Sequence, residues 1–301
     1  MIWLPFIACA VLTGIHCYLG LHVVMRGVIF VDLALAQIAA MGTAVGLICG
    51  LEPGSIAIYL VSLVFTFVGA AVFSLARFKD HRVPQEAMIG ITYAVSTAVT
   101  LLILSKSAVE TEQLKSMLEG ELLFVTWPQV YKTLVIYGGV GLIHWTFRRP
   151  FFAISRDHGR TMTASARRGW DFLFYMTFGL VVTSSVQIAG VLLVFSFLVA
   201  PAVCAMMFFD SATARLLTGW SLGMIATVFG LTASWTWDLP PAMSIVAVFG
   251  AMVASFSAAY ALVRRRRSFA RPHPSDAPAG VAAFLSAAPA RERDSGSRCK
   301  T

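Results

Sequence analysis

Charged residues are scarce in this sequence. Asp, Glu, Lys and Arg make up 13% of its 301 residues, whereas 58% are hydrophobic. Because soluble globular chains carry about 25% charged residues, this composition excludes an ordinary soluble domain and predicts an all-α, polytopic membrane protein. The net charge of +8 would suggest a nucleic-acid partner in a soluble protein. Here we expect the lipid bilayer as the partner, and no nucleic acid.

Motifs of ATP hydrolysis and of common membrane enzymes are also absent. Without a GxxxxGK[ST] phosphate-binding loop, the chain is not expected to bind and hydrolyse ATP by itself. It has no HExxH, no GxSxG and no compact His/Asp cluster with zinc spacing. Its five cysteines lack CxxC spacing, which predicts a reduced or buried setting without a disulfide framework. We therefore expect neither catalysis by this chain nor a tightly bound cofactor.

Nine apolar windows are long enough to cross a hydrocarbon core of ~30 Å, which takes about 20 residues. They are roughly 2–24, 30–51, 55–76, 87–105, 128–147, 170–188, 190–209, 214–234 and 241–263. The first window has no basic segment before it, so a retained span is expected rather than a cleaved signal peptide. Only Gln187 to Gly190 separate the sixth and seventh windows, and a single re-entrant unit is the alternative there.

Basic residues lie mainly on alternate connections between these windows. One set comprises Arg26, Arg77, Lys79, Arg82, Arg148, Arg149, Arg156, Arg160, Arg167, Arg168, Arg215 and the run 264–267. The other connections hold only Lys106 and Lys115, with Lys132 near the start of the fifth window. By the positive-inside rule, this asymmetry predicts an N-terminus outside and a C-terminus in the cytoplasm.

Two segments differ from the apolar windows. Residues 1–263 form the predicted transmembrane domain, whereas 264–301 are rich in Pro, Ala, Ser and Arg and predict a basic, disordered cytoplasmic tail. Between Ser105 and Trp127, leucines at helical spacing predict a helix on the outer surface. An acidic outer mouth that could accept a cation is expected from Glu110, Glu112, Glu119, Glu121 and Asp238.

The segment 27–42, GVIFVDLALAQIAAMG, places Asp32 and Gln37 in an apolar run. A carboxylate in hydrocarbon costs at least a few kcal/mol, so Asp32 predicts a polar station on a route across the bilayer. The alternative is a position at the headgroup level, close to Arg26. Residues five apart lie about 140° apart around a helix. Asp32 and Gln37 therefore share a site only if the helix is broken or two subunits meet there.

Two other features are open to two interpretations each. His22 is the span histidine nearest Asp32 in sequence and is either a ligand of a shared site or a hydrogen-bonded packing residue. In the segment 208–215, FFDSATAR, Asp210 and Ser211 are placed to cap the following helix. This segment is either a simple turn between spans or a docking element for a cytoplasmic motor.

Four stretches in order, 27–42, 82–104, 188–202 and 231–243, resemble the membrane permease subunits of bacterial ABC importers for zinc, manganese and iron. The likeness covers roughly residues 10 to 263. It implies an all-helical permease related in fold to the cobalamin-importer permeases, working as a homodimer in the bacterial inner membrane. It also implies two cytoplasmic ATPase subunits and an extracytoplasmic metal-binding protein that delivers the ion.

The resemblance places the ATPase-coupling helix near Ala205 to Leu216. The expected coupling residues are Ala205, Phe209, Asp210, Ser211 and Arg215. In the second span the family pattern is Gly-Asp-x-x-Ser-His, and this sequence departs from it. Aligned through Gln37, the family's Asp position holds Leu33; aligned on Asp32, Ala36 replaces the His. One ligand of the family's pair is missing in either alignment.

We therefore expect a permease whose transported substrate is a divalent metal ion. Asp32 would attract the cation, with Gln37 and His22 as neutral donors. An amide oxygen is a harder and weaker donor than imidazole, which leaves the metal open. The alternative function is a secondary cation transporter or channel that needs no ATPase.

Overall fold

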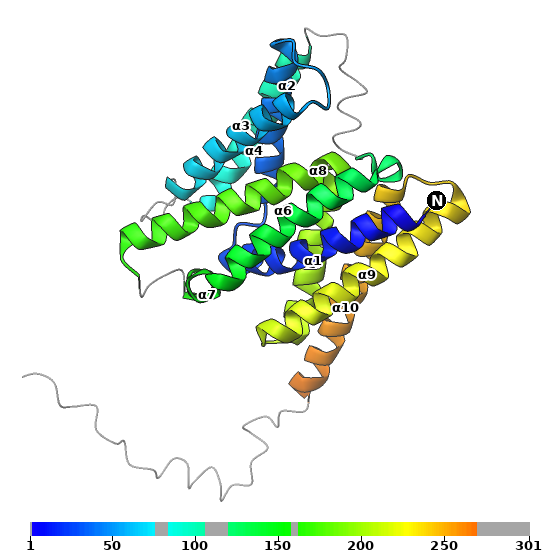
Figure 1. Cartoon of the computed structure of the whole chain (residues 1–301). Coiled ribbons are helices and arrows are strands. Elements are labelled where there is room, and N and C mark those ends of the chain that lie inside the picture. The colour runs from blue at the N-terminus through cyan, green and yellow to red at the C-terminus, as the bar shows by residue number, and fades with distance from the viewer. Residues whose placement is uncertain (1, 76–83, 106–119, 158–161, 270–301) are drawn as a thin grey trace, which may run out of the picture. The chain divides into compact units, whose positions relative to one another are not determined.

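The structure is a computed structural model that describes residues 2–75, 84–105, 120–157 and 162–269 (Figure 1). Its elements are α1 (Trp3–Arg26), α2 (Val31–Ile48), α3 (Ile56–Leu75), α4 (Gln85–Leu104), the 3-10 helix η1 (Leu122–Phe124), α6 (Trp127–Thr146), α7 (Arg148–Asp157), α8 (Ala164–Phe208), α9 (Ala212–Trp237) and α10 (Pro241–Phe269). All regular structure within the described ranges is helical. The chain forms two compact units, 1–257 and 258–301, and the site lies in the first.

The predicted polytopic, all-α class is confirmed. In the part of the chain that the structure describes, seven helices are long and apolar enough to cross a membrane: α1, α2, α3, α4, α8, α9 and α10. Helix α8 has 45 residues and contains two of the predicted spans. Helix α6 has 20 residues and corresponds to the fifth window, although it is less apolar. These two helices account for the difference between seven and the nine predicted windows.

Gly190 divides α8 into two spans. Its backbone angles, φ 74° and ψ 163°, are non-helical and lie where a side chain would be strained. Before this residue, Ser185 bonds His16 of α1; after it, Leu198 lies against Gly20 of the same helix. The chain therefore turns back along α1 at Gly190, which favours two separate spans over one re-entrant unit.

Helix α1 is the centre of the first unit and packs against α6, α7, α8 and α9. Apolar residues such as Cys9, Leu19 and Val23 are fully buried on it. A helix that is apolar around its whole circumference is stable only when protein or lipid surrounds it. At Gly20, an added Cβ would lie 1.9 Å from the carbonyl oxygen of Leu198, so α8 and α1 meet backbone to backbone.

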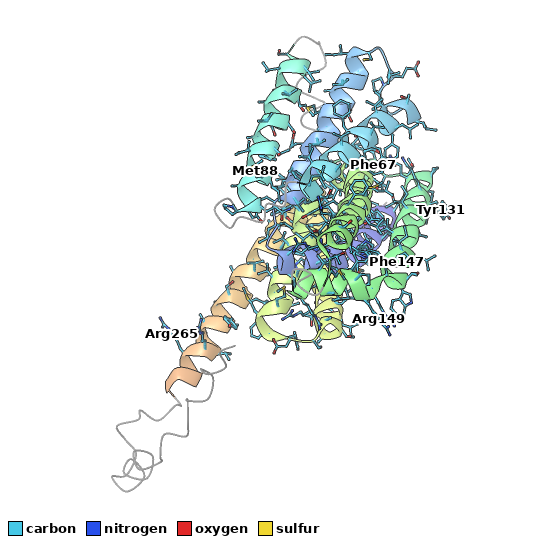
Figure 2. All side chains as sticks on the ribbon, turned by 90° about the vertical axis from the view of Figure 1, so that its left-hand side faces the viewer. Phe67, Met88, Tyr131, Phe147, Arg149 and Arg265 are labelled. Carbon is cyan, nitrogen blue, oxygen red and sulfur yellow. The ribbon has the colours of Figure 1, made fainter. Side chains whose placement is uncertain are left out.

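Helices α2, α3 and α4 lie side by side (Figure 1), and α2 packs against both neighbours and α8. Small residues permit this approach. Gly42 lies against the backbone of Ser62, and the Ser62 hydroxyl donates to the Ala39 carbonyl at 2.8 Å. Many large side chains point outward, among them Tyr131 and Phe147 (Figure 2). These residues form the surface expected to face lipid.

Two predicted segments fall largely outside the described residues. The proposed surface helix between Ser105 and Trp127 is described only from 120 onward, where η1 forms. Helix α10 continues to Phe269, past the predicted domain boundary at 263, and the remaining tail, 270–301, lies outside the described ranges. The boundary and the disorder of the tail stay predictions.

Replacing Gly20 with Ala is expected to destabilise the fold by about 1–3 kcal/mol, because the new methyl group overlaps the backbone of Leu198. The matched control is Gly14→Ala on the same helix, where an added Cβ meets nothing within 4 Å. Thermal unfolding of the purified chain in detergent measures both. Equal unfolding temperatures for the two variants would contradict the close contact between α1 and α8.

Candidate functional site

A cavity of about 390 Å³ opens between α2, α3, α6 and α8. Small and apolar residues form part of its wall, including Ala36, Ala40 and Gly54. The polar lining residues are Thr43, Ser55, Tyr59, Ser62, Glu121, Gln129, Lys132, Thr183 and Gln187. The donors that this wall offers a metal ion are hydroxyl, amide and carboxylate oxygens, without imidazole or thiol. Oxygen ligands of this kind suit hard divalent cations such as Mn²⁺.

A pair of hydroxyl groups joins two walls of this cavity. Thr183 of α8 lines the cavity, and its Oγ1 lies 3.0 Å from Oγ1 of Thr66 on α3. Gly179, one turn earlier on α8, lies against the Thr66 methyl group, where an added Cβ would approach to 2.6 Å. The Thr66–Thr183 contact therefore fixes the distance between α3 and α8.

Asp32 lies one turn from the cavity wall along α2. Residues 32, 36 and 40 follow one stripe of the helix, and Ala36 and Ala40 line the cavity. Asp32 is 1% exposed, and neither carboxylate oxygen has a hydrogen-bond partner among the described residues. The carboxylate therefore faces the protein interior, which favours the predicted polar station over the headgroup position. A buried charge without a partner is costly and marks a candidate functional group.

A hydrogen-bonded group of side chains lies beside the middle of α1. The Tyr137 hydroxyl bonds the hydroxyl of Ser185. Ser185 also contacts Nε2 of His16 at 3.1 Å, and Nδ1 of His16 lies 2.7 Å from the Leu12 carbonyl. Both nitrogens of His16 are thus occupied, so this ring is a packing residue that orients Tyr137 through Ser185.

The structure does not bring Gln37 and His22 to Asp32. Gln37 is half-buried on a different face of α2 and does not line the cavity. His22 is fully buried, with Nδ1 2.7 Å from the Ser155 hydroxyl of α7 and its ring against Phe174. Among the described residues there is no group of three or more His, Cys, Asp or Glu that could hold a metal ion. The metal-binding roles of Asp32, Gln37 and His22 stay predictions.

His22 belongs instead to a buried polar network that sequence reasoning missed. Nη1 of Arg26 lies 3.0 Å from Oδ1 of Asp171, and both side chains are 1% exposed. Nε of Arg26 donates to Ser155 at 3.0 Å, and the guanidinium lies 3.8 Å from the ring centroid of Phe174. Arg26 is therefore buried within the protein at the end of α1. The sequence feature that could have indicated this network is Asp171, an acid at the start of a predicted span.

The predicted coupling segment is a capped turn. Helix α8 ends at Phe208 and α9 begins at Ala212, so Phe209, Asp210 and Ser211 form the link. The Ser211 hydroxyl accepts from the amide of Ala214, and Nε of Arg215 donates to the Phe209 carbonyl at 2.6 Å. Asp210 is fully exposed and lies 3.7 Å from Arg215, whereas Ala205 is buried in α8. The three linking residues form no separate helix, whereas the rest of the predicted range 205–216 lies in α8 and α9. The coupling role of these residues stays a prediction.

The predicted acidic mouth is divided. Glu121 lines the cavity, whereas Asp238 lines a separate pocket with Ile2 and Leu239. Glu110, Glu112 and Glu119 lie outside the described residues. The structure thus assigns one of the five predicted acids to the cavity.

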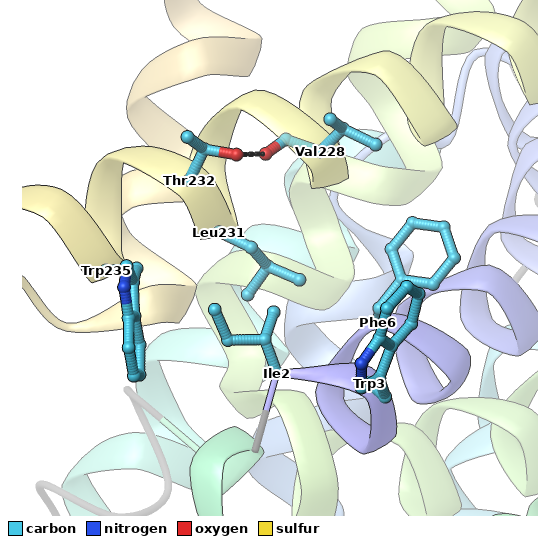
Figure 3. A pocket seen from close by; sticks show the side chains of 7 residues that line it. All are labelled: Ile2, Trp3, Phe6, Val228, Leu231, Thr232 and Trp235. Carbon is cyan, nitrogen blue, oxygen red and sulfur yellow. Dashed lines mark hydrogen bonds between the residues drawn. The ribbon is translucent and has the colours of Figure 1, made fainter.

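A third pocket, between the start of α1 and the end of α9, is unsuited to a cation (Figure 3). It is lined by Ile2, Trp3, Phe6, Val228, Leu231, Thr232 and Trp235. The Thr232 hydroxyl already donates to the Val228 carbonyl at 2.8 Å. The lining has no carboxylate, imidazole or thiol, so this pocket offers a metal ion no ligand of the usual kinds.

Replacing Asp171 with Asn is expected to destabilise the chain by about 3–5 kcal/mol, because it leaves the buried charge of Arg26 without its carboxylate. The double variant Arg26→Met, Asp171→Leu removes both charges and should recover most of this loss. Asp210→Asn, at the exposed pair with Arg215, serves as the control and should be neutral. Unfolding in detergent measures all three. An Asp171→Asn variant as stable as the control would refute the structural role of the pair.

This chain is similar to membrane proteins of bacterial metal transport systems. The family model described as the ABC 3 transport family matches residues 2–260. A manganese transport system membrane protein, MntC of Listeria monocytogenes, is 25% identical over 75% of this chain and 82% of its own length. A chelated iron transport system membrane protein, YfeD of Yersinia pestis, is 26% identical over 77% of this chain and 76% of its own.

Solved structures show the same fold. PsaBC from Streptococcus pneumoniae aligns with a TM-score of 0.69 and 20% identity over 84% of this chain and 90% of its own. A metal-chelate type ABC transporter in an inward-facing conformation aligns with a TM-score of 0.62 and 17% identity over 84% and 85%. The predicted resemblance is confirmed. Because the family model covers nearly all of the described residues, this chain belongs to the ABC 3 transport family.

Proposed function

We propose that this chain is the transmembrane subunit of an ABC importer that carries a divalent transition metal across the bacterial inner membrane, with its N-terminus outside. The observation that carries the proposal is the Asp32 carboxylate, which is buried and without a hydrogen-bond partner one turn from an oxygen-lined cavity. Family membership and relatives named for manganese and iron transport support it. Under this orientation the cavity opens toward the outer side.

The donor chemistry favours manganese or iron over zinc. A cation in the cavity meets the oxygens of Tyr59, Thr183 and Glu121 before it reaches Asp32. Soft or imidazole ligands, which zinc prefers, are missing from the lining, and the second span lacks the Asp and His pair of the family. The carboxylate of Asp32 supplies the negative charge that offsets the loss of the ion's hydration shell.

Transport energy comes from separate subunits in this proposal. The chain lacks a phosphate-binding loop, so two cytoplasmic ATPase subunits act on a dimer of this chain, and an extracytoplasmic metal-binding protein delivers the ion. The capped turn at 209–211 is the proposed ATPase contact. A secondary transporter would instead move metal in liposomes that contain this chain alone, and no structural feature favours that function.

Asp32→Asn keeps the shape of the side chain but removes its charge. We expect Mn²⁺ uptake by the reconstituted importer to fall by at least about tenfold, because one buried charge contact with the ion is lost. Insertion into the membrane should be unchanged, since the carboxylate makes no hydrogen bond among the described residues. Asp238→Asn, in a separate pocket, is the control. Full uptake by Asp32→Asn would remove the basis of the proposal.

Asp210→Lys tests the ATPase contact. The substitution reverses the charge of an exposed side chain and repels Arg215, its neighbour at 3.7 Å. We expect ATP hydrolysis that depends on the metal-binding protein to fall several-fold while the chain remains in the membrane. Ser221→Thr, at an exposed position further along α9 and outside the turn, is the control and should behave as wild type. Unchanged coupling in Asp210→Lys would place the ATPase contact elsewhere.

A further inference from the structure

Among the described residues, Lys132 is the one basic residue in the lining of the oxygen-rich cavity, and Glu121 is the one acidic residue there. The Nζ atom of Lys132 lies 3.6 Å from the ring centroid of Tyr59. This distance is well within the ~6 Å range in which an ammonium group is attracted to an aromatic face. The lysine charge is therefore directed into the cavity and held over a ring of its wall.

The contact joins two walls of the cavity. Lys132 comes from α6, which packs against α1, α7 and α8, whereas Tyr59 comes from α3, which packs against α2 and α8. Tyr59 lies about one turn before Ser62 on α3. The Ser62 hydroxyl bonds the Ala39 carbonyl of α2. The ammonium group thus bridges from the α6 side of the cavity to the α2–α3 side.

Tyr59 has the features of a platform for a cation. Its hydroxyl is shielded from solvent and has no hydrogen-bond partner among the described residues. A buried tyrosine in a purely structural role usually places its hydroxyl in a hydrogen bond. Here the aromatic face holds the lysine, and the hydroxyl oxygen remains available within the cavity lining.

We propose that the Lys132 ammonium is a tethered cation that occupies the entry cavity, and that an incoming divalent ion displaces it from the Tyr59 ring. This inference rests on the proposed metal transport. The physical reason is repulsion between like charges. Charges of +1 and +2 about 8 Å apart repel each other even at the dielectric constant of water. This repulsion lowers the occupancy of the cavity by the ion roughly sixfold.

The consequence is a cavity that holds free cations weakly. Glu121 attracts an ion and Lys132 repels it, so the part of the wall that the structure describes carries one charge of each sign. The uncompensated negative charge lies deeper, at Asp32. Ions free in solution are therefore disfavoured at the mouth of the cavity. An ion that a delivery protein holds against the cavity still enters, because its local concentration there is high.

Lys132→Gln removes the tethered charge and keeps a side chain of similar reach. Binding of Mn²⁺ to the purified permease–ATPase complex is measured by loss of the electron paramagnetic resonance signal of free Mn²⁺. We expect about fivefold tighter binding for Lys132→Gln at low salt and a smaller difference at 0.5 M salt, because salt screens exposed charges.

A charge-conserving variant and a distant pair provide the controls. Lys132→Arg retains the cation and should bind Mn²⁺ as wild type does. Arg148 stacks on Trp145 at 4.8 Å, outside the cavity lining. Arg148→Gln removes a cation of the same kind and should leave Mn²⁺ affinity unchanged.

Uptake by proteoliposomes that contain the whole importer separates the two proposals. A wild-type importer that carries no divalent metal overturns the proposed function and this inference with it. A wild type that transports Mn²⁺, with equal or undetectable Mn²⁺ binding in wild type and Lys132→Gln, overturns the tethered cation alone. Tighter binding in Lys132→Gln that persists at 0.5 M salt also overturns it, since the effect would not be electrostatic.

Discussion

The break in α8 at Gly190 decides where the polar residues of the cavity lie. With a helical conformation at Gly190, α8 would continue as one straight helix. The observed φ of 74° instead reverses the chain so that it runs back along α1. The carbonyl of Ile188 then accepts the amide of Glu121 at 3.1 Å, so a backbone group at the break is satisfied by another segment. The same bond brings Glu121 to the cavity, beside Gln187 and Val186 of α8. An acid and an amide reach one wall because a single glycine is not helical.

The described helices bury two carboxylates in different ways. Asp171 forms an ion pair with Arg26, which itself bonds Ser155 and stacks on Phe174. This arrangement ties α1, α7 and α8 together. Asp32 has no hydrogen-bond partner among the described residues. Breaking a buried pair is strongly destabilising, so the network of Asp171 is structural, whereas the unpartnered carboxylate of Asp32 is the group that we propose attracts the cation.

The sequence alone was sufficient for the spans and for Asp32, but not for tertiary partners. Apolar windows predicted every long helix, and a carboxylate in such a window pointed inward on energetic grounds. The Arg26–Asp171 pair joins residues 145 positions apart, and no local pattern encodes such a pairing. His22 was placed near Asp32 because the two are close in sequence. Gly27, with φ 67°, ends α1 and redirects the chain, so the histidine ring faces α7 instead.

Charge along the route explains why a neutral entrance is compatible with cation transport. A strongly acidic mouth would hold a divalent ion tightly, and release toward the interior would then be slow, because conduction requires sites that an ion can leave. Hydroxyl and amide oxygens, with Glu121 and Lys132 of opposite sign, provide contacts without deep binding. In the proposed route, Asp32 provides the stronger attraction further in. The order from weak to strong then draws an ion from the wall toward Asp32, whereas ATP hydrolysis by the partner subunits sets the direction of transport.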